Sequence, residues 1–149
     1  MSESYTLLLQ AACEAREHSY SPYSNFRVGA ALLCADGRVI TGANVENASL
    51  GLTICAERVA VGRAVAEGRR EFKAIAICAD GATPTPPCGA CRQVLLEFAP
   101  DMEVIFVGEN GPSGEMVRTT VRDLVPHAFS DFRAAHDHSA AADDGAAKP

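Results

Sequence analysis

The sequence has no excess of basic residues and no long apolar run. Its 13 Lys and Arg residues are outnumbered by 19 Asp and Glu residues, which gives a formal net charge of -6 and a pI near 5.1. A protein that follows a phosphate backbone needs a basic surface, so this charge balance counts against a nucleic-acid partner. No apolar run approaches the roughly 18 residues of a membrane-spanning helix, so we also expect no membrane partner.

The N-terminal residues M-S-E-S-Y lack the basic region and the cleavage site of a secretory signal peptide. We therefore expect a cytoplasmic protein. The 149 residues amount to one ordinary domain, and 48% hydrophobic against 21% charged residues is typical of a compact one. A domain of this size buries enough surface to need no disulfide bonds.

Apolar periodicity and turn residues predict an α/β protein. Asp36-Gly37 between two apolar runs predicts a β-hairpin, and Gly68 and Pro100 are expected to end helices. A hairpin followed by two strand–helix alternations predicts one mixed five-stranded sheet with helices on both faces, a three-layer α/β/α sandwich. The expected helices span residues 5–17, 55–67, 89–98 and 121–124, and the expected strands span residues 27–34, 39–45, 72–78, 102–107 and 116–120.

The C-terminal residues 136–149 differ in composition from the rest of the chain. They contain no aromatic or large aliphatic residue, so we expect a disordered tail behind one domain of residues 1–135. His136 and His138 of this tail are interpreted as solvated side chains rather than as a metal-binding tract.

Three of the six cysteines stand alone and three are grouped. The isolated thiols lie among alanine, leucine and isoleucine residues and are expected to pack in the core: Cys13, Cys34 and Cys78. The grouped ones are Cys55 in C-A-E, and Cys88 and Cys91 in P-C-G-A-C-R-Q. Clustered cysteines in a reducing cytosol indicate a metal site or catalysis.

The three grouped cysteines have the spacing of a zinc site. Cys88 and Cys91 are about one turn apart at the expected start of a helix, and Cys55 opens the preceding helix. The N–H groups and the positive dipole end of a helix N-terminus lower the pKa of a thiol and favour the thiolate. If both helices begin at the same end of the sheet, three thiolates converge. Three protein ligands suit a catalytic zinc ion, one per chain, whereas structural zinc normally has four.

Two other interpretations of the C-x-x-C pair fit less well. If the pair were half of a structural zinc ribbon, a second C-x-x-C or paired histidines would have to supply the other ligands. The sequence has neither; its histidines are His18, His127, His136 and His138. A thioredoxin-like redox pair normally opens the first helix of its fold and leaves C-A-E without a role.

Three thiolates give a zinc centre a net negative charge, which opposes ionisation of a bound water. Arg58, within one turn of Cys55, is the candidate that offsets this charge by hydrogen bonding to a ligand sulfur, and the alternative is an exposed helix arginine. Gln93 is a weaker candidate for the same support, and an ordinary polar helix position fits it equally well. Arg92 is interpreted as a surface or interface charge.

Taken together, these motifs resemble the small zinc-dependent cytidine deaminases. The resemblance covers about residues 5–130 and includes, in order, S-P-Y-S-N-F-R-V-G-A-A-L, N-V-E-N-A-S, C-A-E-R and P-C-G-A-C-R-Q-V-L. Relatives that act on tRNA, nucleotides or the free base usually have His in place of Cys55. Blasticidin-S deaminase shares the three cysteines but lacks N-V-E-N-A-S. The resemblance implies hydrolytic deamination of free cytidine and 2′-deoxycytidine to the uridine nucleosides and ammonia, in pyrimidine salvage.

The resemblance also implies roles in the reaction centre. The zinc ligands of the family match Cys55, Cys88 and Cys91, and its catalytic acid and base matches Glu57. Ala56 matches the position whose main-chain amide helps to hold the base. No organic cofactor is implied.

Further matches concern the substrate and a neighbouring subunit. Asn44 and Glu46 match the pair that binds the ribose hydroxyls, with Val45 between them counted as a substrate contact, and Phe26 matches the aromatic ring against the pyrimidine. Phe129 resembles a C-terminal aromatic residue that reaches a neighbouring subunit's site, which implies a homotetramer with composite active sites. Leu50 stands where the family usually has Tyr or Phe, which puts the aromatic contact with Phe129 in doubt.

Three alternatives belong to other classes of function. One is a deaminase of another aminopyrimidine nucleoside, such as blasticidin S. Another is a non-catalytic zinc module, related to RNA-binding proteins, which the complete set of Cys55, Glu57, Cys88 and Cys91 and the acidic charge disfavour. The third is a thiol redox protein.

Overall fold

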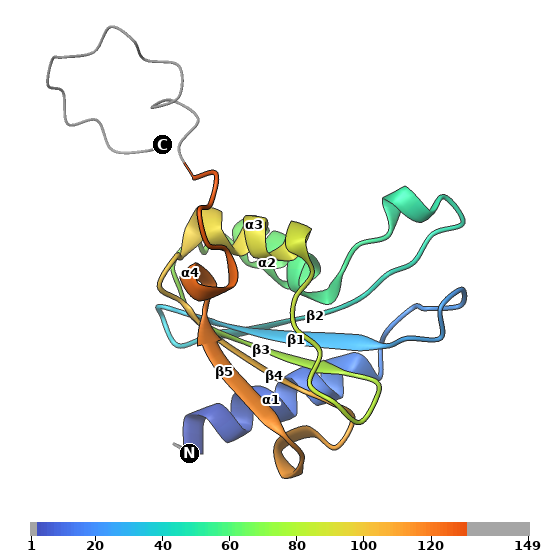
Figure 1. Cartoon of the computed structure of the whole chain (residues 1–149). Coiled ribbons are helices and arrows are strands. Elements are labelled where there is room, and N and C mark those ends of the chain that lie inside the picture. The colour runs from blue at the N-terminus through green and yellow to red at the C-terminus, as the bar shows by residue number, and fades with distance from the viewer. Residues whose placement is uncertain (1–2, 131–149) are drawn as a thin grey trace, which may run out of the picture.

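The computed structural model describes residues 3–130, which form a five-stranded sheet with helices on both faces (Figure 1). The strands are β1 (Val28–Cys34), β2 (Val39–Ala43), β3 (Phe72–Ala79), β4 (Glu103–Val107) and β5 (Met116–Thr120). The α-helices are α1 (Glu3–Arg16), α2 (Ala56–Ala66), α3 (Gly89–Phe98) and α4 (Val121–Leu124).

The strands lie in the order β2-β1-β3-β4-β5. β1 is antiparallel to both β2 and β3, β3 is parallel to β4, and β4 is antiparallel to β5. Parallel neighbours need a crossover connection, and α3 supplies it between β3 and β4. The predicted mixed five-stranded α/β sheet is therefore confirmed.

Alternate residues of the central strands point to opposite faces of the sheet and form two cores. On one face, Leu9 and Ala12 of α1 pack against small and β-branched side chains that include Ala76 and Ile105. On the other face, α2, α3 and α4 pack together over the sheet, as Figure 1 shows. Ile75, Ile77 and Val104 are among the buried strand residues on this second face.

Two glycines allow helices to approach the sheet closely. A Cβ atom at Gly29 of β1 would lie 2.1 Å from the carbonyl oxygen of Ala12, and one at Gly42 of β2 would lie 2.4 Å from that of Ala56. Neither position has room for a side chain. Gly42 thus determines how closely the first turn of α2 lies on the sheet.

The observed elements differ from the predicted ones mainly at their ends. The strand expected to reach residue 45 ends at Ala43. At Asn44 the side chain, and not only the main chain, bonds to the neighbouring strand β1. The N–H of Val28 donates to Asn44 Oδ1 at 2.8 Å, while the N–H of Asn44 donates to the carbonyl oxygen of Val28 at 3.1 Å. Short 3-10 helices at Leu50–Leu52 and Gly111–Ser113 occupy segments expected to be a loop and a turn.

Of the isolated cysteines, Cys78 and Cys13 belong to the core under α1, and Cys34 belongs to the core on the opposite face of the sheet. Cys34 and Cys78 are buried, as predicted, whereas Cys13 is half-buried at the edge of the α1 core. Within residues 3–130, no helix combines the length and the apolar character needed to cross a membrane. The predicted tail, with His136 and His138, lies outside the described residues.

Candidate active site and metal centre

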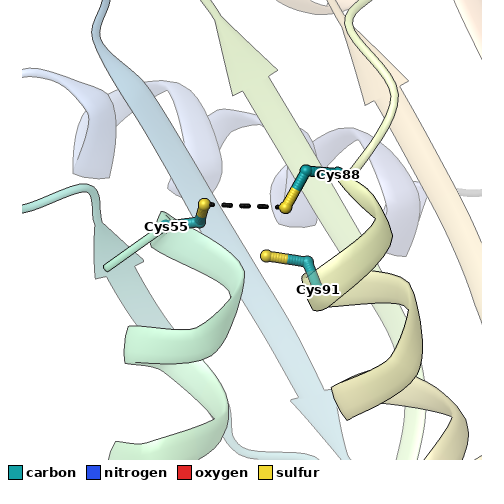
Figure 2. A group of neighbouring side chains, drawn as sticks. All are labelled: Cys55, Cys88 and Cys91. Carbon is teal, nitrogen blue, oxygen red and sulfur yellow. Dashed lines mark hydrogen bonds between the residues drawn. The ribbon is translucent and has the colours of Figure 1, made fainter. Parts of the chain in front are cut away.

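The starts of α2 and α3 bring three thiols together. Cys55 and Cys88 are the N-cap residues of these helices, and Cys91 lies in the first turn of α3. Figure 2 shows the three side chains pointing toward one another from the two helix starts. Their Sγ atoms all lie within 4.8 Å of one another, and those of Cys55 and Cys88 are 3.8 Å apart. The two helices therefore do begin at the same end of the sheet, as the zinc hypothesis requires.

The thiol cluster fits zinc in both donor chemistry and spacing. Zinc–sulfur bonds of about 2.3 Å in a tetrahedral arrangement place two sulfur atoms about 3.8 Å apart. Cys91 is buried, Cys55 is half-buried and Cys88 is exposed, so the cluster opens to one side. Three thiols with one open side are typical of a catalytic centre, and the group accommodates one zinc ion per chain.

Arg58 lies against this cluster. Its Nη2 atom donates to Cys55 Sγ at 3.5 Å and to the carbonyl oxygen of Thr53 at 3.2 Å. Hydrogen bonding with Cys91, with Arg58 and with Cys88 lowers the pKa of the Cys55 thiol to about 5. The guanidinium thus both orients a sulfur atom and supplies positive charge beside it.

Glu57 is a buried carboxyl group beside the thiols. It lies in the first turn of α2 and is only 4% exposed. Burial raises the pKa of Glu57 above the ordinary range of a carboxyl group. A raised pKa favours the protonated form of a carboxyl group, which suits a group that carries a proton.

A cavity of about 240 Å³ lies beside the thiols and Glu57 and is also lined by residues just before β1 and just after β2. Cys55, Glu57 and Cys88 line it on one side. The remaining lining residues are Ser24, Phe26, Val28, Asn44, Glu46, Thr53, Ile77, Thr85 and Pro86. Its volume lies below the roughly 300–1,000 Å³ of pockets for drug-sized ligands, which favours a small substrate.

Asn44 lies at the end of β2 and is 7% exposed. Its Oδ1 atom accepts hydrogen bonds from the Val28 N–H at 2.8 Å and from Ser19 Oγ at 2.5 Å, and its Nδ2 atom donates to the Phe26 carbonyl oxygen at 2.9 Å. An amide nitrogen carries two hydrogens. The acceptor side of Asn44 is therefore used within the protein, and a second N–H is left for the cavity.

Glu46, in contrast, offers acceptors. Its Oε2 atom accepts from the main-chain N–H groups of Tyr23 at 2.8 Å and Ser24 at 3.2 Å, and Oε1 accepts from Ser24 Oγ. The Ser24 hydrogen bond, aided by the main-chain N–H groups, holds the pKa of Glu46 below its ordinary value. Glu46 is thus an ionised acceptor on the cavity wall.

The remaining substrate-contact predictions are placed differently. Phe26 is 38% exposed and lines the cavity. Val45 is not among the residues that line this cavity, and it lines a separate hollow together with His18 and Arg63. Ala56 is fully buried in the α2 core, with its main-chain N–H in the first turn of the helix.

Two predicted residues lie outside the thiol cluster and the cavity lining. Gln93 Nε2 donates to the carbonyl oxygen of Phe129 at 2.8 Å, so it holds the C-terminal segment rather than a sulfur atom. The Phe129 side chain is 64% exposed and does not line the cavity of its own chain. Leu50 is exposed as well.

Several features of the site were missed in the sequence. Arg92, interpreted as a surface or interface charge, donates to the carbonyl oxygens of Pro87 at 2.7 Å and Leu124 at 3.0 Å and so joins the start of α3 to α4. Among the cavity residues, the hydroxyl group of Ser24 was not singled out, although S-P-Y-S-N-F contains it.

The chain has clear relatives among proteins of known activity. A family model described as the cytidine and deoxycytidylate deaminase zinc-binding region matches residues 2–108. A cytidine deaminase of Halalkalibacterium halodurans is 52% identical over 124 residues, which cover 83% of this chain and 92% of the relative. The chain belongs to the cytidine deaminase family.

Solved structures of this family have the same fold. A cytidine deaminase from Burkholderia pseudomallei aligns with a TM-score of 0.79 at 48% identity, covering 87% of this chain and 100% of that one. A more distant relative, the blasticidin-S deaminase of Bacillus cereus, is 31% identical over 111 residues, or 69% of this chain and 76% of the relative. The family's zinc-binding region includes all three thiols of the cluster.

Proposed function

We propose that the chain hydrolyses cytidine and 2′-deoxycytidine to uridine and 2′-deoxyuridine, with release of ammonia, in pyrimidine salvage. The observation that carries this proposal is the buried carboxyl group of Glu57 beside three thiols, at one side of a small cavity. This arrangement supports Glu57 as the proton carrier and the three thiols as the metal site beside the substrate.

The chemistry divides between the metal site and Glu57. When bound by Cys55, Cys88 and Cys91, zinc acts as a Lewis acid and lowers the pKa of water. Glu57 accepts the proton of the water that attacks C4 of the base and delivers protons to N3 and to the departing amine. Burial raises the pKa of Glu57, which favours the protonated form that the second half of this transfer requires.

Asn44 and Glu46, which also line the cavity, suit a sugar hydroxyl group. Asn44 has an N–H to donate and Glu46 has carboxylate oxygens that accept, so one hydroxyl group can bond to both. The negative charge of Glu46 repels a phosphate group, which favours a nucleoside over a nucleotide. Phe26 provides the aromatic face for the pyrimidine and the Ala56 N–H a donor for the base. Val45, between Asn44 and Glu46, remains a proposed substrate contact.

The exposed apolar residues support assembly into a homotetramer. Leu50, Leu52 and Phe129 are 72%, 64% and 64% exposed, which is a large apolar surface for a lone chain. In the proposed tetramer, Phe129 reaches the site of a neighbouring subunit. The expected compartment is the cytoplasm. Sedimentation analysis of the purified protein checks the assembly directly, since a monomeric species at working concentration contradicts it.

The substrate is tested by following the ultraviolet absorbance of cytidine after addition of protein with a known zinc content. We expect loss of the cytidine band with release of ammonia, and little change with CMP or cytosine. Equal turnover of CMP contradicts the assigned role of Glu46.

A second substrate has support from the blasticidin-S deaminase relative, which is 31% identical to this chain. Comparison of kcat/KM on cytidine and on blasticidin S separates the two. Asn44 and Glu46 line the cavity and offer a donor and an acceptor that suit a sugar hydroxyl group, so we expect the higher value with cytidine.

A further inference from the structure

The loop between α1 and β1 places one hydroxyl group between two residues of the proposed substrate site. Ser24 lines the cavity together with Phe26 and Glu46. Its Oγ atom donates to Glu46 Oε1 and accepts from the main-chain N–H of Phe26 at 3.0 Å. One side chain thus contacts both the proposed sugar-binding carboxylate and the residue proposed to face the base.

The carboxylate of Glu46 is already anchored at its other oxygen atom. Oε2 accepts the N–H groups of Tyr23 and Ser24, so the side chain is held before Ser24 Oγ contributes. The hydroxyl group therefore orders Oε1 at little further entropic cost, even though the contact is exposed. Hydrogen bonds to an ionised acceptor are stronger than those between neutral groups.

We infer that Ser24 is a positioning residue for substrate binding, whose hydroxyl group orients the Glu46 carboxylate relative to Phe26. This inference rests on the proposed function, because it assigns Ser24 a role through the sugar-binding residue. A carboxylate oxygen has two acceptor sites. Oε1 can therefore accept from Ser24 and from a substrate hydroxyl group at once, with the first bond setting the direction of the second.

Steady-state kinetics with cytidine test this role. Ser24→Ala is expected to raise KM about tenfold with kcat within about twofold, because Glu57 and the three thiols are unchanged. Ser24→Thr keeps a hydroxyl group and is expected to stay near the wild-type KM. Ser113→Ala is the control, since Ser113 lies in the 3-10 helix Gly111–Ser113 and outside the cavity lining.

A double-mutant cycle separates action through Glu46 from general damage to the loop. Once Glu46→Ala has removed the carboxylate, adding Ser24→Ala should raise KM by less than about threefold. A tenfold effect in both backgrounds overturns the inference. So do an unchanged KM in Ser24→Ala, an equal loss in Ser113→Ala, or a loss confined to kcat.

A second pair of variants tests the same role even if Ser24→Ala fails to fold. Ser24→Val and Ser24→Thr are close in shape and differ in the hydroxyl group, so a similar KM for the two contradicts the inference. If the wild-type protein turns over cytidine and replacing Ser24 leaves KM unchanged, this inference alone is overturned. Wild-type protein that carries zinc and leaves cytidine unchanged overturns the proposed function, and the role of Ser24 with it.

Discussion

The chemistry of this site depends on where single side chains lie relative to solvent. Glu57 is buried and Cys88 is exposed, although both line the same cavity. In the proposed reaction, burial favours the protonated form of the Glu57 carboxyl group, whereas exposure of one thiol leaves the metal site open to substrate. Replacing Glu57 should therefore affect turnover, whereas replacing Cys88 should affect zinc binding.

Glu57→Gln should retain zinc and lose at least about a thousandfold in kcat, because the amide cannot exchange protons. Zinc analysis and cytidine turnover on the same preparation measure both effects. Glu115→Gln, an exposed position, serves as the control and should behave as wild type. Near-normal turnover by Glu57→Gln contradicts its role as acid and base.

Cys88→Ala should lose the metal and, with it, the activity, because two thiols hold zinc far more weakly than three. Cys13→Ala removes a half-buried thiol outside the cluster and should keep one zinc per chain. Metal analysis after gel filtration measures this difference. Stoichiometric zinc in Cys88→Ala shows that Cys88 is not a ligand.

At the scale of elements, the site exists because two helices begin at the same place. Cys55 and Cys88 occupy the N-cap positions of α2 and α3, and neither cap makes a side-chain hydrogen bond to the helix. Gly42 brings the first turn of α2 onto β2, where a side chain would collide with the Ala56 carbonyl oxygen. The position of Glu57 and Cys55 therefore depends on a glycine in another element.

Gly42→Ala should lower the free energy of unfolding by about 1–3 kcal/mol and also reduce activity, because α2 must move away from the sheet. Gly62→Ala is the matched control in α2, where an added Cβ meets nothing within 4 Å. It should stabilise the helix by roughly 0.5–1 kcal/mol. Urea unfolding measures both, and equal stability of the two variants contradicts the close approach at Gly42.

The sequence allowed the elements to be predicted, but not every contact at their ends. The thiol cluster followed from local signals, since Cys55, Cys88 and Cys91 stand at helix starts. Side chains alternate along a strand, so Val45 is expected on the opposite face from Asn44 and Glu46. In the structure it lines a different hollow from these two neighbours. The hydrogen bond of Gln93 to Phe129 joins positions 36 residues apart, and no local pattern predicts such a contact.

At the scale of the whole molecule, ion pairs connect elements at the active-site end of the sheet. Arg27, just before β1, pairs with Asp80 after β3 at 3.0 Å, and Arg16 of α1 approaches the same carboxylate at 3.7 Å. Burial opposes ionisation of Asp80, but hydrogen bonds and charges from the two arginines outweigh it and lower the pKa of Asp80. This carboxylate thereby joins α1, β1 and β3.

Asp80→Asn should lower the free energy of unfolding by about 1 kcal/mol at pH 7, because Arg27 is itself partly exposed. A lowered folded-state pKa gives stability that is present above the unfolded value of about 3.9 and is lost as pH falls through the folded value. The difference from wild type should therefore be constant above about pH 5 and shrink below about pH 4.

Urea unfolding from pH 7 to pH 3 measures this dependence. Asp101→Asn is the control, because Asp101 pairs with Arg122 on the exposed surface and should change stability little. A difference between Asp80→Asn and wild type that persists undiminished at pH 3 contradicts the role assigned to the Asp80 carboxylate.

In the proposed function, zinc held by the three thiols and Glu57 together deaminate cytidine. The most direct test of this function follows ammonia release from cytidine by the full chain as purified, after chelation of the metal, and after zinc is restored. We expect turnover to disappear on chelation and to return in proportion to zinc, up to one ion per chain. Protein with one zinc per chain and no ammonia release contradicts the account.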